Sequence, residues 1–464
     1  MTVSADLHVP SALRDAVPPR HLLTDRDTVA PYLHDEAEWA PHGRAVAVVR
    51  PSSTAEVAAV VTACAAHGIP VVTRGAGTGL SGGANAVEGC VILSTERMRD
   101  IVEINPAERL AVVGPGVVND HLRAAAAAQD LWYPPDPASA PWSTIGGNVA
   151  TNAGGLCCVK YGVTRDYVLA LEVVLASGEV VRLGRRTAKG VVGYDLAGLM
   201  VGSEGTLGVI TEVTVTLRPA RTTVPRTVVG FFDTLAAAGD AVSRVTAAGL
   251  QPSIFELVDR VCLRAVNDWK RTGLPENAAA LLLAQTDLPE PAAQYEAEAM
   301  HAEFVAAGAT DAMLSTDPVE AEALFDARRL AYPALEQLGQ AMLTEDVCVP
   351  RARVAEMLAR IEGIAARRDT VIATVAHAGD GNLHPLMLTP HGDDAARLRT
   401  QAAFDDIVDA ALELGGTVTG EHGVGLLKQA GARKELGPAV VAMHRAVKAA
   451  LDPQGILNPG KIIG

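Results

Sequence analysis

The chain has 464 residues, a formal net charge of −15, 49% hydrophobic residues and 4% aromatic residues. This length allows two or three domains with a large core, and the composition excludes a disordered or collagen-like chain. The net negative charge argues against nucleic acid and against an anionic membrane surface as partners.

Six cysteines are scattered along the chain without a C-x-x-C pair, which predicts reduced thiols and a cytoplasmic location. The first residues lack the basic and apolar regions of a signal peptide. No uncharged apolar run free of glycine and proline reaches the roughly 18 residues of a membrane helix, so no membrane span is expected.

A polar lead-in over residues 1–40 precedes a β-α-β pattern. The residues predict a strand over 45–50, a helix over 54–67 and a second strand over 69–73. Ser53 or Thr54 suits the N-cap of this helix, and Gly68 suits its C-terminal end.

The first glycine-rich stretch, residues 74–83, contains the spacing G-x-G of a Rossmann loop. No helix opens after it and no acidic residue follows at the required distance, so the Rossmann interpretation fails. Its glycines expose backbone amides that suit a pyrophosphate. A glycine-rich hairpin without a ligand remains an alternative.

A second stretch, residues 143–155, holds four glycines, two asparagines and two threonines. It follows predicted strands over 101–105 and 109–114, a helix over 118–129 and a rigid, proline-rich segment over 133–139. So many small polar residues indicate backbone packed against something flat and polar, and a flavin with its phosphate tail fits that description. A hairpin over 170–183 and a strand over 211–217 complete this part.

Residues 220–415 alternate strands with helices in a pattern typical of a small antiparallel sheet backed by helices. Strands are predicted over 227–232, 253–257 and 278–285, and helices over 234–248, 291–307 and 393–414. A further helix is expected to begin at Leu324.

A β-hairpin is predicted from an apolar run starting at Val371, the turn signal Asp380-Gly381 and a second apolar run ending near Leu388. A two-residue loop with positive φ at both positions would set His377 directly opposite His384. Two imidazoles held this way can share a metal ion. A chance pair of strand histidines remains the alternative.

Seven motifs in order resemble the FAD-dependent D-2-hydroxy-acid dehydrogenases of the vanillyl-alcohol-oxidase/para-cresol-methylhydroxylase flavoproteins. They are VVTRGAGTGLSGG, PPDPAS, TIGGNVATNAGG, YDLAGLMVGSEGTLGVIT, VAHAGDGNLHP, GTVTGEHGVG and LDPQGILNPGK. The resemblance implies an α+β fold: a two-subdomain FAD-binding domain over residues 41–219 and an α/β cap with an antiparallel sheet over 220–415. A C-terminal segment over 416–464 would carry a Glu-His pair and return to the FAD domain.

The resemblance also implies a set of FAD-binding residues. They are Arg74, Gly75, Gly77, Thr78, Gly79, Ser81, Pro135, Asp136, Ser139, Thr144, Gly147, Asn148, Thr151, Asn152, Gly154, Glu204, Gly208, Ile210 and Asn458. Some relatives attach FAD covalently through a histidine in the first glycine loop. This loop has Thr78 near that place, so non-covalent FAD is expected.

The implied catalytic set combines a metal with a base. Glu421 would join His377 and His384 around one divalent ion, Zn²⁺ or Mn²⁺, with Asn382 and Asp380 as orienting residues. Arg328 would bind the substrate carboxylate. The metal would lower the pKa of the substrate hydroxyl, His422 would take its proton, and the hydride would pass to flavin N5.

The expected substrate is a small D-2-hydroxy acid. The hydroxyglutarate enzymes carry a lysine near the place of Thr344 and an asparagine at that of Leu386, so a dicarboxylate is disfavoured here. D-lactate fits best and glycolate comes next. A separate electron acceptor is implied: a quinone, a cytochrome, an electron-transfer flavoprotein or oxygen. A homodimer is left open.

Two other classes of function are weighed against this one. Two histidines and a carboxylate also describe non-haem iron oxygenases, which have no need for dinucleotide-binding stretches. A non-catalytic flavin-binding subunit would keep the glycine loops but would not need His377, His384, Glu421 and His422 together.

Overall fold

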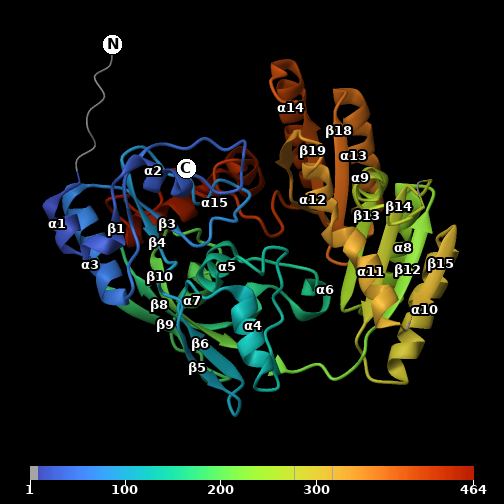
Figure 1. Cartoon of the computed structure of the whole chain (residues 1–464), viewed down its shortest axis with the longest axis horizontal. Helices are drawn as coiled ribbons and strands as arrows, with labels where there is room; N and C mark the ends of the chain where they lie inside the picture. Colours follow the sequence, from blue (N-terminus) through green and yellow to red (C-terminus); the bar gives the residue numbers. More distant parts are fainter. Residues whose placement is uncertain (1–8, 276, 316) are drawn as a thin grey trace. The chain divides into compact units, whose positions relative to one another are not determined.

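The computed structural model describes residues 9–275, 277–315 and 317–464, with side chains left out for 318–322. The chain divides into two compact units (Figure 1). Unit 1 contains the described residues up to Ala153 together with residues 163–220 and 421–464. Unit 2 contains residues 154–162 and 221–420, so Gly154 belongs to unit 2 although it was expected among the flavin contacts.

The first sheet of unit 1 has the strand order β1-β2-β4-β3. Its strands are β1 (Leu22–Leu23), β2 (Ala45–Val49), β4 (Cys90–Ser94) and β3 (Val71–Arg74), and β4 runs parallel to both β2 and β3. Helix α3 (Thr54–His67) joins β2 to β3; the Ser53 side chain caps its start, and Gly68 ends it with φ 62°. The predicted β-α-β unit is therefore confirmed.

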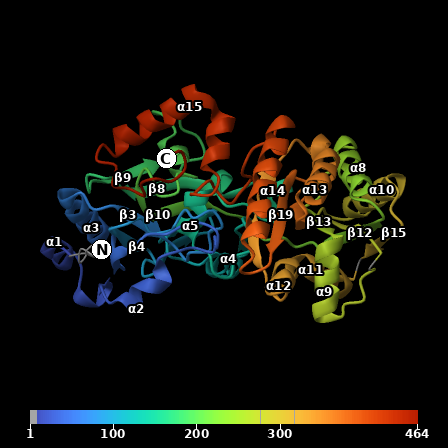
Figure 2. The same cartoon turned by 90° about the horizontal axis from the view of Figure 1, so that it is seen from above.

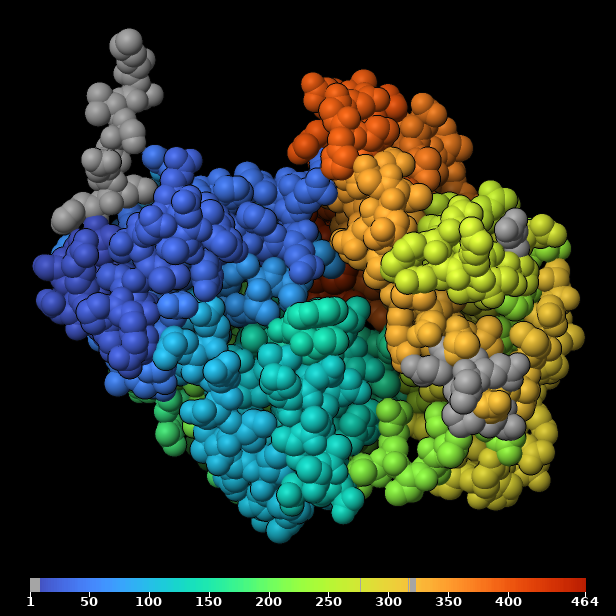
Figure 3. All heavy atoms as spheres, in the orientation of Figure 1, coloured from blue at the N-terminus to red at the C-terminus, as the bar shows by residue number. Residues whose placement is uncertain are grey.

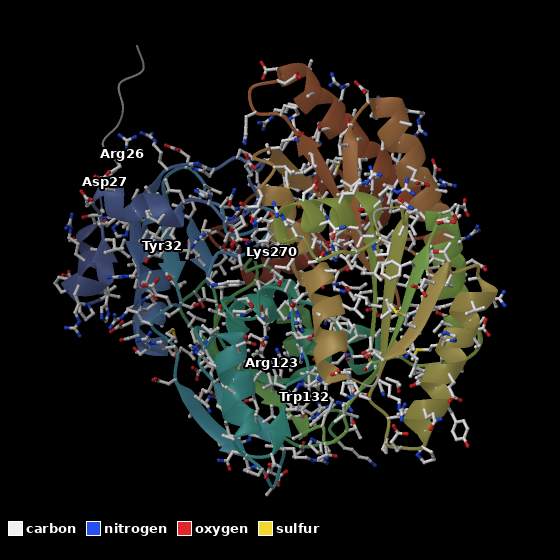
Figure 4. All side chains as sticks on the ribbon, turned by 45° about the vertical axis from the view of Figure 1, so that its right-hand side comes forward. Arg26, Asp27, Tyr32, Arg123, Trp132 and Lys270 are labelled. Carbon is white, nitrogen blue, oxygen red and sulfur yellow. The ribbon has the colours of Figure 1, made fainter. Side chains whose placement is uncertain are left out.

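The second sheet of unit 1 is antiparallel, with the order β5-β6-β10-β8-β9. Its strands are β5 (Ile101–Asn105), β6 (Leu110–Val113), β10 (Val209–Thr216), β8 (Val168–Val174) and β9 (Val180–Gly184). Helices α4 (Asn119–Ala127) and α5 (Ile145–Thr151) contribute Leu122, Ile145 and Val149 to its core. Figure 4 labels Arg123 on α4 and Trp132 on β7 (Leu131–Trp132), which pairs with β11 (Arg218–Pro219).

The chain also contains four short α-helices and one long C-terminal helix outside the large sheet of unit 2. They are α1 (Ser11–Asp15), α2 (Arg26–Val29), α6 (Cys158–Tyr161), α7 (Leu196–Met200) and α15 (Gln429–Leu451), which is interrupted at Gly437. Among the described residues, no helix combines the length and apolar character needed to cross a membrane.

Unit 2 is built on one antiparallel sheet with the order β15-β12-β14-β13-β18-β19-β16, and β17 also pairs with β19. The strands are β15 (Asp311–Ser315), β12 (Arg226–Phe232), β14 (Ala280–Thr286), β13 (Ile254–Asp259), β18 (Val371–His377), β19 (Asn382–Thr389), β16 (Ala341–Thr344) and β17 (Val347–Cys348). This is the antiparallel sheet that the sequence predicted for the cap.

Helices cover both faces of this sheet (Figure 2). One layer contains α8 (Leu235–Ala247), α10 (Ala292–Ala306), α13 (Val354–Arg368) and α14 (Asp394–Glu413). The other contains α9 (Arg260–Lys270), α11 (Pro318–Arg329) and α12 (Ala331–Glu336), and Figure 3 shows α9 (yellow-green) and α12 (orange) on the face turned to the viewer.

The helix expected to begin at Leu324 begins earlier, at Pro318, so that prediction was wrong. A proline is well tolerated in the first turn of a helix, where its missing amide leaves no hydrogen bond unmade. Arg328 therefore lies in the last turn of α11, next to the buried Phe325 and Ala327 that hold the helix against the sheet.

Candidate active site

The hairpin of β18 and β19 forms as predicted, but with a different register. His377 pairs with Asn382 and Val375 pairs with His384, so the loop has the four residues 378–381. The predicted two-residue loop was wrong because the amides of Asp380 and Gly381 both donate to the His377 carbonyl, at 3.0 and 3.1 Å. Of the two expected positions, only Gly381 has a positive φ, at 81°.

The register difference of two residues keeps both histidines on one face of the sheet, because side chains alternate with a period of two. Their ring centroids lie 5.1 Å apart and the ring planes are nearly perpendicular, at 87°. Both residues are buried. The hairpin therefore brings the two imidazoles together as expected, through a diagonal pair rather than a directly opposed one.

A buried carboxylate, Glu256, stands beside the first histidine. Glu256 lies on β13 directly opposite His377, and its Oε1 is 2.7 Å from His377 Nδ1. Its Oε2 accepts a hydrogen bond from Arg328 Nε, also at 2.7 Å. One carboxylate thus contacts both the expected substrate-binding arginine and an expected metal ligand.

A second buried carboxylate, Asp346, stands beside the other histidine. His384 Nδ1 is 3.5 Å from Asp346 Oδ1, and the Asn382 amide donates to the same oxygen at 2.8 Å. The other oxygen accepts from Thr419 Oγ1 at 2.6 Å, and the Gly420 amide donates to the Asp346 carbonyl at 3.0 Å. Asn382 therefore orients Asp346, while the Asp380 carbonyl accepts from Cys348 Sγ at 3.6 Å.

Each imidazole has a buried carboxylate near its Nδ1, at hydrogen-bond distance of 2.7 Å for His377 and at 3.5 Å for His384. Each Nδ1 faces a buried carboxylate, the arrangement that commonly fixes the ring orientation of metal-binding histidines. An imidazole whose Nδ1 donates to a carboxylate has Nε2 left as the nitrogen that can bind a metal ion. The donor set of this face suits a divalent ion such as Zn²⁺, which binds imidazole nitrogen and carboxylate oxygen.

In unit 1, the first glycine-rich stretch leaves β3 at Arg74. The Arg74 guanidinium donates to the His34 carbonyl at 2.7 Å and lies 5.9 Å from the ring centre of Tyr32, which Figure 4 labels. Burial lowers the pKa of Arg74, and Asp35 acts in the opposite direction. The Arg74 side chain thus connects the start of this loop to the segment that contains His34. The expected contacts Gly77, Thr78 and Gly79 are half-buried.

The second glycine-rich stretch lies against the first. A Cβ on Gly75 would come within 2.5 Å of Thr144 Oγ1, so only glycine allows this approach. The Thr144 side chain caps α5 by accepting from the Gly147 amide at 3.3 Å, and Thr151 Oγ1 donates to the Gly147 carbonyl at 3.2 Å. Asn152 ends α5 with φ 56°.

Several other residues that were expected to contact FAD form hydrogen bonds or pack within unit 1. The Pro135 carbonyl accepts from the Asn119 side chain at 3.2 Å, and the Ser139 carbonyl accepts from the Ser143 amide at 2.7 Å. Asp136 is half-buried. Ile210 is buried in β10, and a Cβ on Gly208 would lie 2.4 Å from a methyl group of Val173.

The chain after Glu421 is held by Glu204. Its two carboxylate oxygens accept hydrogen bonds from the amides of Val424 and Gly425, at 2.8 and 2.9 Å. Burial raises the pKa of Glu204 to about 7, while the two amides and Lys461 act in the opposite direction. Burial lowers the pKa of Lys461 to about 8, against the attraction of Asp35 and Glu204.

The chain after Glu421 is also held by a hydrogen bond at His422. Ser81 Oγ donates to the His422 carbonyl at 3.2 Å, and His422 Nε2 is 3.6 Å from Glu421 Oε1. The Asn458 side chain donates to the carbonyls of Gly83 and Glu204, at 2.9 and 2.7 Å. Ser81, Glu204 and Asn458, expected as flavin contacts, therefore tie the His422 loop to the first glycine-rich stretch.

Among the buried polar atoms of unit 1 without a hydrogen-bond partner in the described residues, four flank the two glycine-rich stretches. They are Thr73 Oγ1, Ser143 Oγ, Asn148 Nδ2 and Asn458 Oδ1. Buried polar groups normally have a partner. These atoms, with the glycine backbone beside them, fit a large polar ligand such as FAD.

Comparison with known proteins decides the family. Residues 45–184 match the FAD binding domain, and residues 221–462 match the C-terminal domain of FAD linked oxidases. Over 416 residues the chain is 42% identical to the glycolate oxidase subunit GlcD of Bacillus subtilis, covering 90% of this chain and 88% of that protein. The chain belongs to the FAD-linked oxidases.

Two further likenesses extend over most of this FAD-linked oxidase. It is 35% identical over 458 residues to a D-lactate dehydrogenase of Anaerostipes hadrus, covering 96% of this chain and 95% of that one. The solved structure of p-cresol methylhydroxylase matches with a TM-score of 0.80 at 18% identity, covering 98% and 96% of the two chains. The expected family and the α+β fold are confirmed, and the chain is an FAD-linked oxidoreductase.

Sequence reasoning missed Glu256 and Asp346. Glu256 interrupts the apolar strand Ile254-Phe-Glu-Leu-Val258, and Asp346 stands between Glu345 and an apolar run. A charged residue inside a strand of a covered sheet is rare unless it has a partner. That signal could have identified Glu256 but not its partner, because β13 and β18 are distant in the sequence; Asp346 lies between β16 and β17 and carries no such signal.

Proposed function

We propose that this FAD-linked oxidase converts a small D-2-hydroxy acid to its 2-oxo acid, with non-covalent FAD and one divalent metal ion. The single observation that supports it best is the hairpin face of unit 2. There, two imidazoles lie 5.1 Å apart, and each Nδ1 faces a buried carboxylate.

The proposed metal ligands are His377, His384 and Glu421, with Zn²⁺ or Mn²⁺ as the ion. Glu421 follows Gly420, whose amide donates to the Asp346 carbonyl within unit 2. The ion would supply a Lewis acid for the substrate hydroxyl.

The proposed base is His422. It would accept the hydroxyl proton of the substrate, a role that suits imidazole at neutral pH. Its peptide carbonyl is held by Ser81, and the following amides of Val424 and Gly425 are held by Glu204. FAD, when bound along the two glycine-rich stretches, supplies the two-electron acceptor for the hydride from C2 of the substrate.

Arg328 is proposed to bind the substrate carboxylate. Its side chain is 12% exposed, and Nε is the nitrogen that donates to Glu256. Among the side chains that the structure describes, the terminal nitrogens of Arg328 have no partner. Two terminal nitrogens of a guanidinium match the two oxygens of a carboxylate.

A monocarboxylate is the proposed substrate. Thr344 and Leu386, the positions that carry polar groups in the hydroxyglutarate enzymes, are directly paired across β16 and β19. Leu386 is 1% exposed within an apolar core, so a second carboxylate would meet no charged group at either position. D-lactate remains the favoured substrate of this proposal.

A second candidate is the flavin subunit of a glycolate oxidase. The higher identity to GlcD, 42% against 35% for the D-lactate dehydrogenase, favours glycolate. The name of that relative marks it as a subunit, so a partner chain that carries electrons onward belongs to this candidate. The alternatives for a separate acceptor are a quinone, a cytochrome, an electron-transfer flavoprotein or oxygen.

The test is anaerobic bleaching of the flavin by a panel of D- and L-2-hydroxy acids, with and without a chelator. D-lactate and glycolate should bleach it, and L-lactate and D-2-hydroxyglutarate should do so slowly. Chelation should stop bleaching without releasing FAD, and Zn²⁺ or Mn²⁺ should restore it. Bleaching by L-lactate alone, or indifference to the chelator, would contradict the proposal. No bleaching by any acid would indicate a non-catalytic subunit.

A further inference from the structure

We infer that Glu256 is a positioning residue that fixes the substrate-binding arginine and one metal-binding histidine to a single buried carboxylate. This inference rests on the proposed function, because it assigns Arg328 to the substrate and His377 to the metal. It adds that substrate binding and metal binding both depend on the Glu256 carboxylate.

Each oxygen of the Glu256 carboxylate contacts a different side chain. One oxygen is 2.7 Å from His377 Nδ1 and the other is 2.7 Å from Arg328 Nε. The carboxylate is completely buried, with a side-chain exposure of 0%. A buried carboxylate is tolerated only when it has hydrogen-bond partners, and His377 and Arg328 are the two that Glu256 has among the described residues.

Each contact selects a useful orientation of its partner. A hydrogen bond from His377 Nδ1 to the carboxylate places the proton on Nδ1 and turns Nε2 toward a ligand. A hydrogen bond from Arg328 Nε turns the two terminal nitrogens in the opposite direction along the guanidinium plane, where they can bind a carboxylate through two parallel bonds. The distance between substrate anchor and metal ligand is therefore set by one side chain.

The strand arrangement explains why this position can do so. Glu256 and His377 are direct register partners on β13 and β18, so backbone pairing fixes their approach. Arg328 comes from the last turn of α11, which packs on the sheet through Phe325 and Ala327. A rigid strand pair and a packed helix meet at the carboxylate, and no flexible loop supplies any of the three groups.

The competing explanation is that Glu256 only neutralises a buried arginine. Glu256→Gln separates the two explanations. A glutamine has one acceptor oxygen and an NH₂ group, so it can satisfy His377 or Arg328 but not both as donors. We expect metal affinity to fall about tenfold to hundredfold, the usual loss when the partner of a metal-binding histidine is removed.

The substrate side should change as well. The KM for D-lactate and glycolate should rise about tenfold, since a charge-assisted hydrogen bond that orients Arg328 is lost. The ratio of FAD to protein should stay constant. In metal-free protein with ¹⁵N-labelled histidine, His377 should show the Nδ1–H tautomer, and Glu256→Gln should reduce that signal.

The matched control is Asp259→Asn, on the same strand. Asp259 is also buried, and it accepts from the amides of Cys262 and Thr374, at 2.9 and 2.7 Å. It should lower stability while leaving metal affinity and KM unchanged. If Glu256→Gln behaves like this control, with metal affinity and KM within about twofold of wild type, the inference is overturned.

Two further results distinguish failure of this inference from a variant that does not fold and from failure of the proposed function. If Glu256→Gln does not fold, Glu256→Asp retains the charge, but its shorter side chain cannot span both partners. A Glu256→Asp protein with unchanged metal affinity and unchanged KM also overturns the inference. If the wild-type protein binds no metal and oxidises no 2-hydroxy acid, the proposed function fails, whereas the His377 tautomer still reports on the Glu256 contact.

Discussion

The two units hold their candidate reactive residues by different means. In unit 2, buried carboxylates hold side chains: Glu256 holds His377 and Arg328, and Asp346 lies beside His384. In unit 1, Glu204 and Ser81 form hydrogen bonds with the backbone around His422.

This difference matches what each group has to do. The ring of a metal-binding histidine has to be held in position to within a fraction of an ångström. A contact from its Nδ1 to a fixed carboxylate provides that precision. A base must reach the substrate and then move a proton, so the path of its loop has to be fixed. Substitutions in unit 2 should therefore alter metal binding, and substitutions in unit 1 should alter proton transfer.

The largest effect is expected for His422→Asn. Removing a general base should lower the rate of flavin reduction by about 10³-fold to 10⁴-fold, with FAD and metal contents unchanged. Stopped-flow absorbance under anaerobic conditions measures this rate. The matched control is His444→Asn, at an exposed position on α15, which should leave the rate unchanged. Normal flavin reduction in His422→Asn would remove the base from unit 1 and break the comparison.

The second prediction concerns the pH dependence of stability that Glu204 gives to unit 1, where it holds the chain after His422. Burial raises the pKa of Glu204 to about 7, so the folded protein binds this proton more tightly than the unfolded chain does. The contribution of Glu204 to stability is therefore present at low pH and is lost as pH rises from about 4.5 to about 7. The expected loss is on the order of 3 kcal/mol.

The measurement is the free energy of unfolding in urea across this pH range for wild type and Glu204→Gln. The groups facing Glu204 are the amides of Val424 and Gly425, together with Lys461 and Asp35. Glutamine does not titrate, so the difference between the two proteins should grow in favour of the variant as pH rises. A difference independent of pH would show that Glu204 is ionised throughout and holds the loop as a permanent anion.

Sequence patterns predicted the parts of this site that depend on local chemistry. The Asp380-Gly381 turn signal located the hairpin, and the two glycine-rich stretches located the part of unit 1 with unsatisfied polar atoms. The register of the hairpin was not predictable from the turn residues alone. It depends on the His377 carbonyl accepting two loop amides, which lengthens the loop to four residues.

The parts that depend on distant contacts could not be read from the sequence. Glu256 meets His377 because β13 pairs with β18, across 121 positions of the chain. Helix α5 was also not anticipated, because Gly146 and Gly147 are poor helix formers. In the structure, a Cβ on Gly146 would come within 2.5 Å of Pro115, so a tertiary contact decides the residue there.

The smallest of the three effects is expected for Asp346→Asn. The distance from His384 Nδ1 to Asp346 is 3.5 Å, longer than the 2.7 Å contact between Glu256 and His377, so this carboxylate should orient its ring less strongly. Metal affinity should fall about tenfold, at the lower end of losses for such partners. Competition with a chelator of known affinity measures this change.

The matched control for Asp346→Asn is Asp287→Asn. Asp287 is a buried carboxylate of the same unit whose partners are Lys160, Tyr161 and Arg221, so its loss should affect stability but not metal affinity. A loss larger than that of Glu256→Gln would mean that Asp346 acts as more than an orienting group. An unchanged affinity would leave Glu256 as the carboxylate that matters for the hairpin.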